Sequence, residues 1–155
     1  MLNDQSPFYA CRACTWWALR RANRAVTQHY EASLRGTGLR VAQFALLAML
    51  EQTGPLPLGA LAEMLGLERT SLTRNLQPLE KQGFVRTETD DDQRIRRIAL
   101  TKKGKAAALS ALDAWKQAES TVEAVLRRTG IDKLFGPDKK AFFTKLCDRE
   151  EIPCK

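Results

Sequence analysis

The chain has 155 residues, of which 44% are hydrophobic, a composition that allows one well-packed domain and excludes a disordered chain. Its formal net charge of +7 suits a polyanionic partner, although charge alone does not separate DNA from RNA or from a membrane surface. The N-terminus lacks a secretory signal, and the longest apolar stretch, residues 41–50, is too short to span a bilayer. We therefore expect a cytoplasmic protein with no membrane partner and mostly reduced cysteines.

The first two predicted elements are helices. Pro7, preceded by Ser6 as an N-cap, favours a helix start, and the helix runs to about Leu34 before Gly36 breaks it. This helix is apolar on more than one side, so it must pack against more than one neighbour. The second helix covers roughly residues 41–52.

A short helix over residues 58–65, ended by Gly66, precedes a helix over residues 70–81 whose faces differ in chemistry. With a step of about 100° per residue, Leu72, Leu76 and Leu79 fall on one stripe. Donors, acceptors and cations fall almost opposite: Thr70, Arg74, Gln77 and Lys81. Such side chains suit base edges and phosphates in a DNA major groove.

Pro78 lies inside this predicted helix. It removes one amide donor and crowds the carbonyl of Arg74, which costs up to ~3 kcal/mol in an ordinary helix interior. Two interpretations remain open: the helix bends beyond its base-contacting turns, or it ends near Leu76.

The next segment predicts a β-hairpin, with strands 84–88 and 96–100 around a turn at 89–94. Thr101 can cap a long helix over residues 102–128, and a short final helix opens at 136–138. The long first and fifth helices are too apolar for a central region of about fifty residues alone. An interleaved homodimer accounts for them, although a monomer can also fold its own helices together.

Residues 39–105 combine motifs that are specific when taken together. They are Gln43-Phe44-x-x-Leu47-x-x-Leu50, Leu61-Ala62-x-x-Leu65-Gly66-Leu67, Ser71-Leu72-Thr73-Arg74-x-Leu76-x-x-Leu79-Glu80-x-x-Gly83-Phe84-Val85-Arg86, Asp92-Gln93-Arg94 and Leu100-Thr101-x-x-Gly104. This pattern resembles the winged helix-turn-helix of the MarR family of transcriptional regulators. The flanking helices agree with that family in length and placement only.

The resemblance implies a mainly α fold, with a winged helix-turn-helix over residues 36–105 and a helical dimerisation region over 1–35 and 106–155. It implies a homodimer, usually a repressor, that places helix 70–81 in the major groove of double-stranded DNA and the hairpin wing in the minor groove. The family wing typically reads Asp-Arg-Arg, whereas this chain has Gln93 at the first Arg. Asp92 is then expected to orient Arg94. The expected DNA-binding residues are Thr70, Ser71, Thr73, Arg74, Gln77, Lys81, Asp92, Arg94 and Arg96.

The signal that controls binding is left open by the sequence. Members of the family commonly respond to a small aromatic ligand or to oxidation of a cysteine. Cys11 and Cys14 lie on one face near a predicted helix N-terminus, where the dipole favours thiolate, and Cys147 and Cys154 are candidate resolving partners. Cys11 and Cys14 can also be small apolar packing residues or a soft-metal ligand pair, and we predict no metal site.

A candidate pocket for an aromatic acid consists of Trp16, Trp17, Arg20, Phe44 and Trp115, although aromatic residues at helical spacing more often form a dimer core. No catalytic motif is evident, so we expect neither an enzyme nor a cofactor. The alternative function is a winged-helix module that binds protein or RNA without operator specificity.

Overall fold

The N-terminal segment forms two helices rather than one. The computed structural model describes residues 6–89 and 96–130. A 3-10 helix, η1 (Tyr9–Ala13), precedes α1 (Thr15–Leu34), and Cys14 between them is extended, with φ −64° and ψ 118°. The prediction of a continuous helix from Pro7 is therefore wrong. Helices gain most of their stability from packing an apolar face, and Phe8 is 74% exposed, so nothing here favours a longer α-helix.

The second helix, α2 (Val41–Thr53), confirms its predicted position. A short 3-10 helix, η2 (Arg35–Thr37), and Gly38 turn the chain between α1 and α2. The buried side chain of Gln43 accepts a hydrogen bond from the backbone N–H of Arg40 at 3.0 Å. Glu31 of α1 accepts another from the N–H of Val41 at 3.2 Å. The N–H groups of Arg40 and Val41 at the start of α2 thus have partners, which the first amides of a helix cannot find within the helix itself.

Helices α3 (Leu58–Leu65) and α4 (Arg69–Lys81) form the helix-turn-helix. Gly66 adopts the left-handed conformation expected of a helix end, with φ 61°. Helix α4 continues through Pro78, and the N–H of Gln82 donates to the Pro78 carbonyl at 3.1 Å. The interpretation that the helix ends near Leu76 is therefore wrong.

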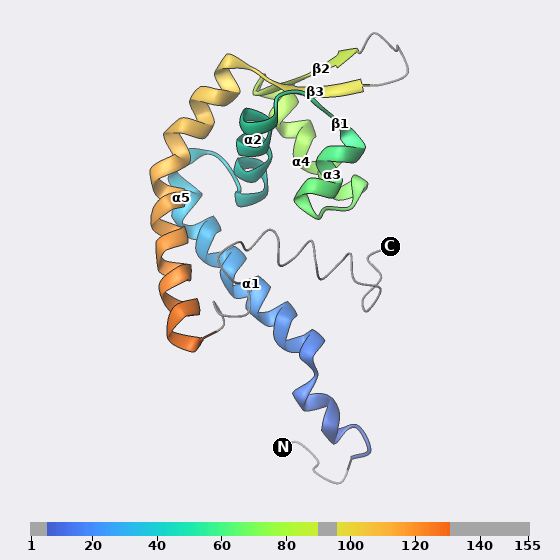
Figure 1. Cartoon of the computed structure of the whole chain (residues 1–155), viewed down its shortest axis with the longest axis vertical. Coiled ribbons are helices and arrows are strands. Elements are labelled where there is room, and N and C mark those ends of the chain that lie inside the picture. The colour runs from blue at the N-terminus through green and yellow to red at the C-terminus, as the bar shows by residue number, and fades with distance from the viewer. Residues whose placement is uncertain (1–5, 90–95, 131–155) are drawn as a thin grey trace. The chain divides into compact units, whose positions relative to one another are not determined.

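Three strands form one antiparallel sheet, in the order β1-β3-β2 (Figure 1). The hairpin strands β2 (Val85–Thr89) and β3 (Arg96–Leu100) confirm the predicted ribbon. A third strand, β1 (Leu56–Pro57), pairs Leu56 with Ile98 and corrects the prediction of only two strands. Two residues are too few to show an alternating pattern, and their partner lies about forty residues further along, so no local signal reveals this strand.

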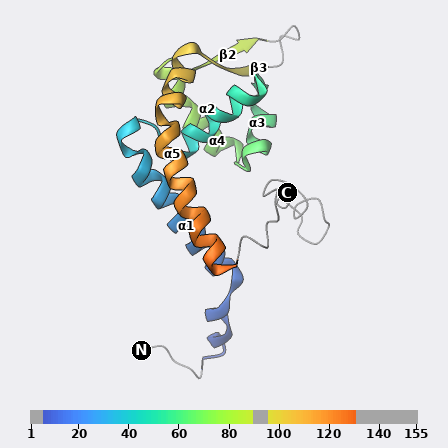
Figure 2. The ribbon, with the colours of Figure 1, turned by 60° about the vertical axis from the view of Figure 1, so that its left-hand side comes forward.

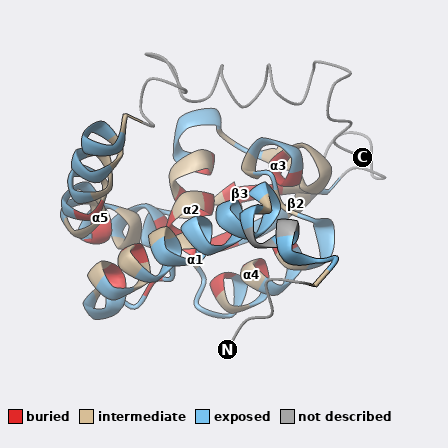
Figure 3. Ribbon diagram, turned by 90° about the horizontal axis from the view of Figure 1, so that it is seen from below, coloured by how far each residue is buried: buried red, intermediate tan, exposed pale blue. Residues whose placement is uncertain are grey.

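The core lies where α2, α3 and α4 meet the sheet and the first turns of α5 (Lys102–Thr129). Leu47, Leu61 and Leu72 are fully buried there. Figure 3 shows the buried positions on the inward sides of α2, α3 and α4. Phe44 stacks on Trp115 with ring centroids 5.7 Å apart. This core fixes the orientation of α4, which therefore presents one face outward.

The chain divides into two compact units, Met1–Trp115 and Lys116–Lys155, with the boundary inside α5. In the second unit, the described part of α5 runs to Thr129 and ends before Gly130, whose φ is 71°. Ala118 is buried there. The predicted final helix from 136–138 falls outside the described residues. Among the helices that the structure describes, none is both long and apolar enough to traverse a bilayer.

Candidate nucleic-acid interface

Helix α4 separates an inward face from an outward face. Leu72, Leu76 and Leu79 are at most 4% exposed, as their spacing predicts. The four polar side chains expected on the other side are all exposed: Thr70, Arg74, Gln77 and Lys81. Within residues 6–89 and 96–130, the side chains of Arg74, Gln77 and Lys81 make no hydrogen bond or ion pair. This face therefore offers two cations and an amide with their hydrogen-bonding groups available to a ligand.

Two other expected positions on α4 are partly engaged by the helix itself. The hydroxyl of Thr73 donates to the carbonyl of Arg69 at 2.8 Å. The amide of Asn75 donates to the carbonyl of Ser71 at 2.9 Å, and Ser71 is half-buried. Thr73 still has acceptor lone pairs and an exposed methyl group, so it can contact a ligand in those ways only.

A hydrogen bond ties the outward helix to the hairpin. The hydroxyl of Thr87 in β2 donates to Oε1 of Glu80 in α4 at 2.9 Å. The register pairs Thr87 with Ile98 of β3, so the bond couples the hairpin to α4 near the middle of its strands. The helix and the hairpin thus present a connected surface.

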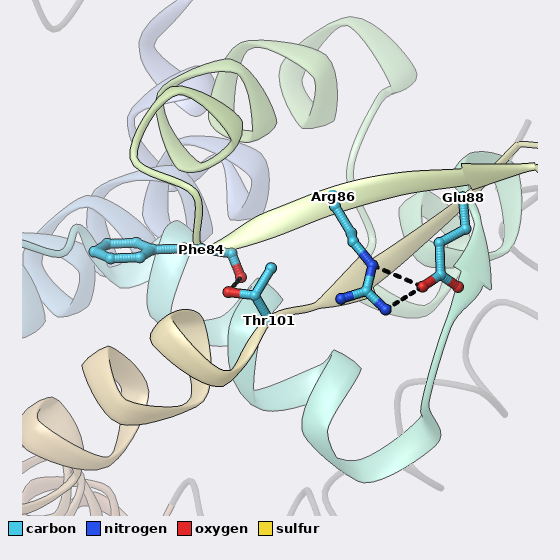
Figure 4. A network of polar contacts seen from close by, with 4 residues as sticks. All are labelled: Phe84, Arg86, Glu88 and Thr101. Carbon is cyan, nitrogen blue, oxygen red and sulfur yellow. Dashed lines mark hydrogen bonds and ion pairs between the residues drawn. The ribbon is translucent and has the colours of Figure 1, made fainter.

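The wing carries one described residue of the expected set, Arg96, which is exposed at the start of β3. Asp92 and Arg94 fall outside the described residues. Arg86 on β2 is already paired: its Nε and Nη2 atoms lie 2.8 Å and 2.5 Å from Oε1 of Glu88 (Figure 4). Arg86 is exposed, so this pair contributes little stability but holds the guanidinium along the strand.

The base of the hairpin is joined to the start of α5 by hydrogen bonds between side chains and backbone groups. The hydroxyl of Thr101 lies 2.7 Å from the Gly83 carbonyl and 3.1 Å from that of Phe84 (Figure 4), and it accepts the N–H of Gly104 at 3.0 Å. This confirms Thr101 as the cap of α5. Lys103 donates to the Gln82 carbonyl at 2.8 Å. These hydrogen bonds hold the residues just before β2 against the start of α5.

One residue of this surface was missed by the sequence reasoning. Helix α4 begins at Arg69, one position before the predicted start, with extended Glu68 as its N-cap. Arg69 is exposed and lies beside Gly59 of α3. Its signal in the sequence is weak, because a helical wheel of α4 alone places Arg69 near the leucine stripe rather than opposite it.

The two described cysteines lie at the junction of η1 and α1. Cys11 belongs to η1 and is exposed, and Cys14 is the N-cap residue of α1 and half-exposed. The N–H of Cys14 donates to the Cys11 carbonyl at 3.1 Å. Both thiols are free. The candidate resolving residues Cys147 and Cys154 fall outside the described residues.

The five aromatic-pocket candidates lie in two places. Phe44 is buried and stacked on Trp115, which makes both part of the core. Trp16 and Trp17 are 60% and 50% exposed on α1, and the Arg20 guanidinium lies 5.4 Å from the Trp16 ring centroid. Figures 1 and 2 both show the N-terminal half of α1 projecting away from α2. Trp17 and Arg20 border an open depression of about 330 Å³ that Cys14 also lines.

Comparisons with known proteins agree with this arrangement. A family model described as the MarR family matches residues 39–95. The transcriptional regulator MosR of M. tuberculosis, solved in complex with DNA, is 36% identical, with a TM-score of 0.66 over 77% of this chain and 92% of MosR. The chain therefore belongs to the MarR family of transcriptional regulators, and the winged helix-turn-helix assignment is confirmed.

Two further relatives extend the comparison. The HTH-type transcriptional regulator MhqR of Bacillus subtilis is 30% identical over 56% of this chain and 60% of MhqR. A structure described as overoxidized AbfR bound to DNA is 26% identical, with a TM-score of 0.61 over 77% of this chain and 90% of AbfR. This chain spans 57% to 62% of the length of the curated relatives that it matches.

Proposed function

We propose that this chain is a homodimeric, sequence-specific DNA-binding repressor of a pseudo-palindromic operator. The observation that carries the proposal is the outward face of α4, where Thr70, Arg74 and Gln77 are exposed opposite a buried leucine stripe. Arg and Gln are the side chains that pair with guanine and adenine edges in the major groove. The DNA complex of MosR, 36% identical to this chain, supports the same partner class.

The wing supplies the second part of the contact in this proposal. Arg94, oriented by Asp92, enters the adjacent minor groove, because a narrow and electronegative groove attracts guanidinium groups. Arg96 binds the DNA backbone next to that groove. On α4, the side chains that contact phosphates are those of Ser71, Thr73 and Lys81. The bond from Thr87 to Glu80 supports this arrangement, since it couples the wing to α4.

The dimer is proposed from the exposed apolar surface near the N-terminus. Phe8, Trp16 and Leu19 are 74%, 60% and 65% exposed, although side chains of this kind are usually buried. Large exposed apolar patches mark interaction sites, and a second copy of this chain supplies the same surface. Residues 1–35 and 106–155 are then the dimerisation region. With two-fold symmetry, the operator half-sites lie about one helical turn of DNA apart.

The experiment that tests the proposal is selection of bound DNA from a random pool, followed by the salt dependence of binding to the selected site. A symmetric motif is expected. Substitution of Thr70, Arg74 or Gln77 by Ala should change the preferred base at particular positions, whereas Arg94→Ala should weaken binding with a shallower salt slope. If no motif is selected, or if only RNA or protein is bound, the function is not operator recognition.

For the control signal, we propose oxidation of the cysteines at the η1–α1 junction. The observation that supports an oxidant as the signal is the exposed, free thiol of Cys11 beside the free thiol of Cys14. Mild peroxide should weaken DNA binding, and Cys11→Ser or Cys14→Ser should abolish the effect. A response that survives both substitutions rules the cysteines out.

An aromatic acid is the competing effector, because Arg20 and Trp16 already form a cation–π pair on an exposed surface. Repeating the selection with aromatic acids separates the two effectors. An acid-driven release that Arg20→Ala prevents, together with no response to peroxide, would favour the ligand over the cysteines.

A further inference from the structure

Arg69 is an exposed cation at the first position of α4 whose role the outward face does not explain. A helical step of about 100° puts Arg74 opposite the leucine stripe, but it puts Arg69 on the flank of that stripe that faces α3. Arg69 therefore cannot read the same base edges as Arg74. Within the described parts of the chain, 6–89 and 96–130, no carboxylate forms an ion pair with it. The Arg69 guanidinium is therefore available to an anionic ligand on the element proposed to face DNA.

The Arg69 guanidinium lies beside a glycine of the preceding helix. Helices α3 and α4 lie side by side (Figure 1), and a Cβ added to Gly59 of α3 would lie 3.1 Å from Nη2 of Arg69. The guanidinium thus lies against bare backbone at the second residue of α3. The first turn of α3 has no acidic residue that would neutralise it. A Cβ alone would require the guanidinium to shift by a few tenths of an ångström, so it takes a larger side chain at position 59 to displace the guanidinium from this place.

We propose that Arg69, held against Gly59, is a phosphate-binding residue that positions α4 on the DNA backbone. The ligand is a phosphodiester group, whose oxygens match the planar fork of a guanidinium. Phosphate contacts fix the register of a recognition helix without carrying sequence information. The inference rests on the proposed function, since it adds a backbone contact beside the base contacts of α4.

The test measures binding to the selected operator over a salt titration. Arg69→Ala should weaken binding about tenfold or more, as expected for one lost charge-assisted contact. The slope of log K against log salt should fall by about 0.9, and base preferences should stay unchanged. The charge-matched control is Lys102→Ala, an exposed cation at the first residue of α5 that is outside the proposed DNA contacts and the proposed dimerisation region. It should leave the slope unchanged.

A second variant separates binding from folding. Gly59→Leu introduces a good helix former, so thermal stability should not fall, yet it should displace the guanidinium and weaken binding. In a double-mutant cycle, Gly59→Leu should have little further effect when Arg69 is already Ala. If the loss persists in that background, the leucine obstructs DNA directly and the glycine has no positioning role.

The outcomes distinguish this inference from the proposed function. If the wild-type chain selects an operator but Arg69→Ala matches Lys102→Ala, the phosphate contact is refuted and operator recognition stands. If Arg69→Ala changes which base is preferred, Arg69 reads bases and the phosphate role is refuted. If the wild-type chain selects no DNA, the proposed function and this inference both fail.

Discussion

Among the glycines that the structure describes, Gly104 is the least able to accept a side chain, because it lies where the start of α5 contacts the base of the hairpin. A Cβ at Gly104 would lie 2.0 Å from the carbonyl oxygen of Phe84, 2.8 Å from its carbonyl carbon and 2.9 Å from Cδ1 of Leu100. Two of these atoms are backbone, so no rotamer change relieves the overlap. Gly104→Ala therefore requires α5 and β2 to separate at their junction.

The magnitude follows from what that separation breaks. Moving the oxygen from 2.0 Å to an ordinary contact means a shift of more than about 1 Å. Such a shift disrupts two hydrogen bonds of Thr101, each worth about 1 kcal/mol. One is donated by its hydroxyl and shared between the Gly83 and Phe84 carbonyls, at 2.7 and 3.1 Å, and the other is donated by its N–H to the Phe84 carbonyl at 3.0 Å. Overpacking adds about 1–3 kcal/mol, and the better helix propensity of alanine returns about 1 kcal/mol. We expect a net loss of about 3 kcal/mol.

The assay is urea unfolding followed by circular dichroism, at one protein concentration because a dimer's stability depends on concentration. Gly36→Ala is the matched control, since a Cβ at Gly36 meets nothing within 4 Å. It should be neutral or stabilising by up to about 1 kcal/mol. If Gly104→Ala is as stable as Gly36→Ala, the packing of α5 against Phe84 is not as described.

Three further substitutions have defined expectations in the same assay. Thr101→Val removes the hydroxyl that caps α5 and should cost about 1–2 kcal/mol, since the N–H of Gly104 then loses its acceptor. Phe44→Ala should cost about 3–5 kcal/mol, because Phe44 is buried and stacked on Trp115. Pro78→Ala should raise the free energy of unfolding by about 1–2 kcal/mol, since it restores an amide donor inside α4.

Each of these has an outcome that contradicts it. Thr101→Ser keeps the hydroxyl, so it should be milder than Thr101→Val, and equal losses would argue against the cap. A near-neutral Phe44→Ala would mean that this ring belongs to a ligand site rather than to the core. An unstable Pro78→Ala would show that the proline is favourable in α4.

The helix-turn-helix was the part of the fold most accessible from sequence. Leu72, Leu76 and Leu79 recur at helical spacing, and Gly66 marks the end of α3, so local pattern alone predicts both helices and the buried face. The break in the helix at Cys14 could not be predicted from the sequence. The apolar pattern indicates a helix here, but it does not say whether the apolar face is packed, and packing provides most of a helix's stability. Strand β1 was missed because its pairing is set by a distant partner.

The candidate site residues also include some that local sequence predicts and some that depend on tertiary packing. Exposure of Thr70, Arg74, Gln77 and Lys81 follows from periodicity, since the leucines must face inward. Periodicity does not tell which aromatic side chains lie together, because residue type does not say which rings meet. The five pocket candidates are Trp16, Trp17, Arg20, Phe44 and Trp115. Only the packing of α2 on α5 joins Phe44 to Trp115 and leaves Trp16 exposed on α1.

The polar face of α4 and the ends of most helices follow from local sequence, because side-chain periodicity, glycine conformation and capping act over a few residues. The need for a glycine at position 104 and the contact of Arg69 with Gly59 are visible only in the folded chain. Both depend on the close approach of backbone segments separated in sequence. Such approaches are set by how the core packs, and no local pattern encodes them.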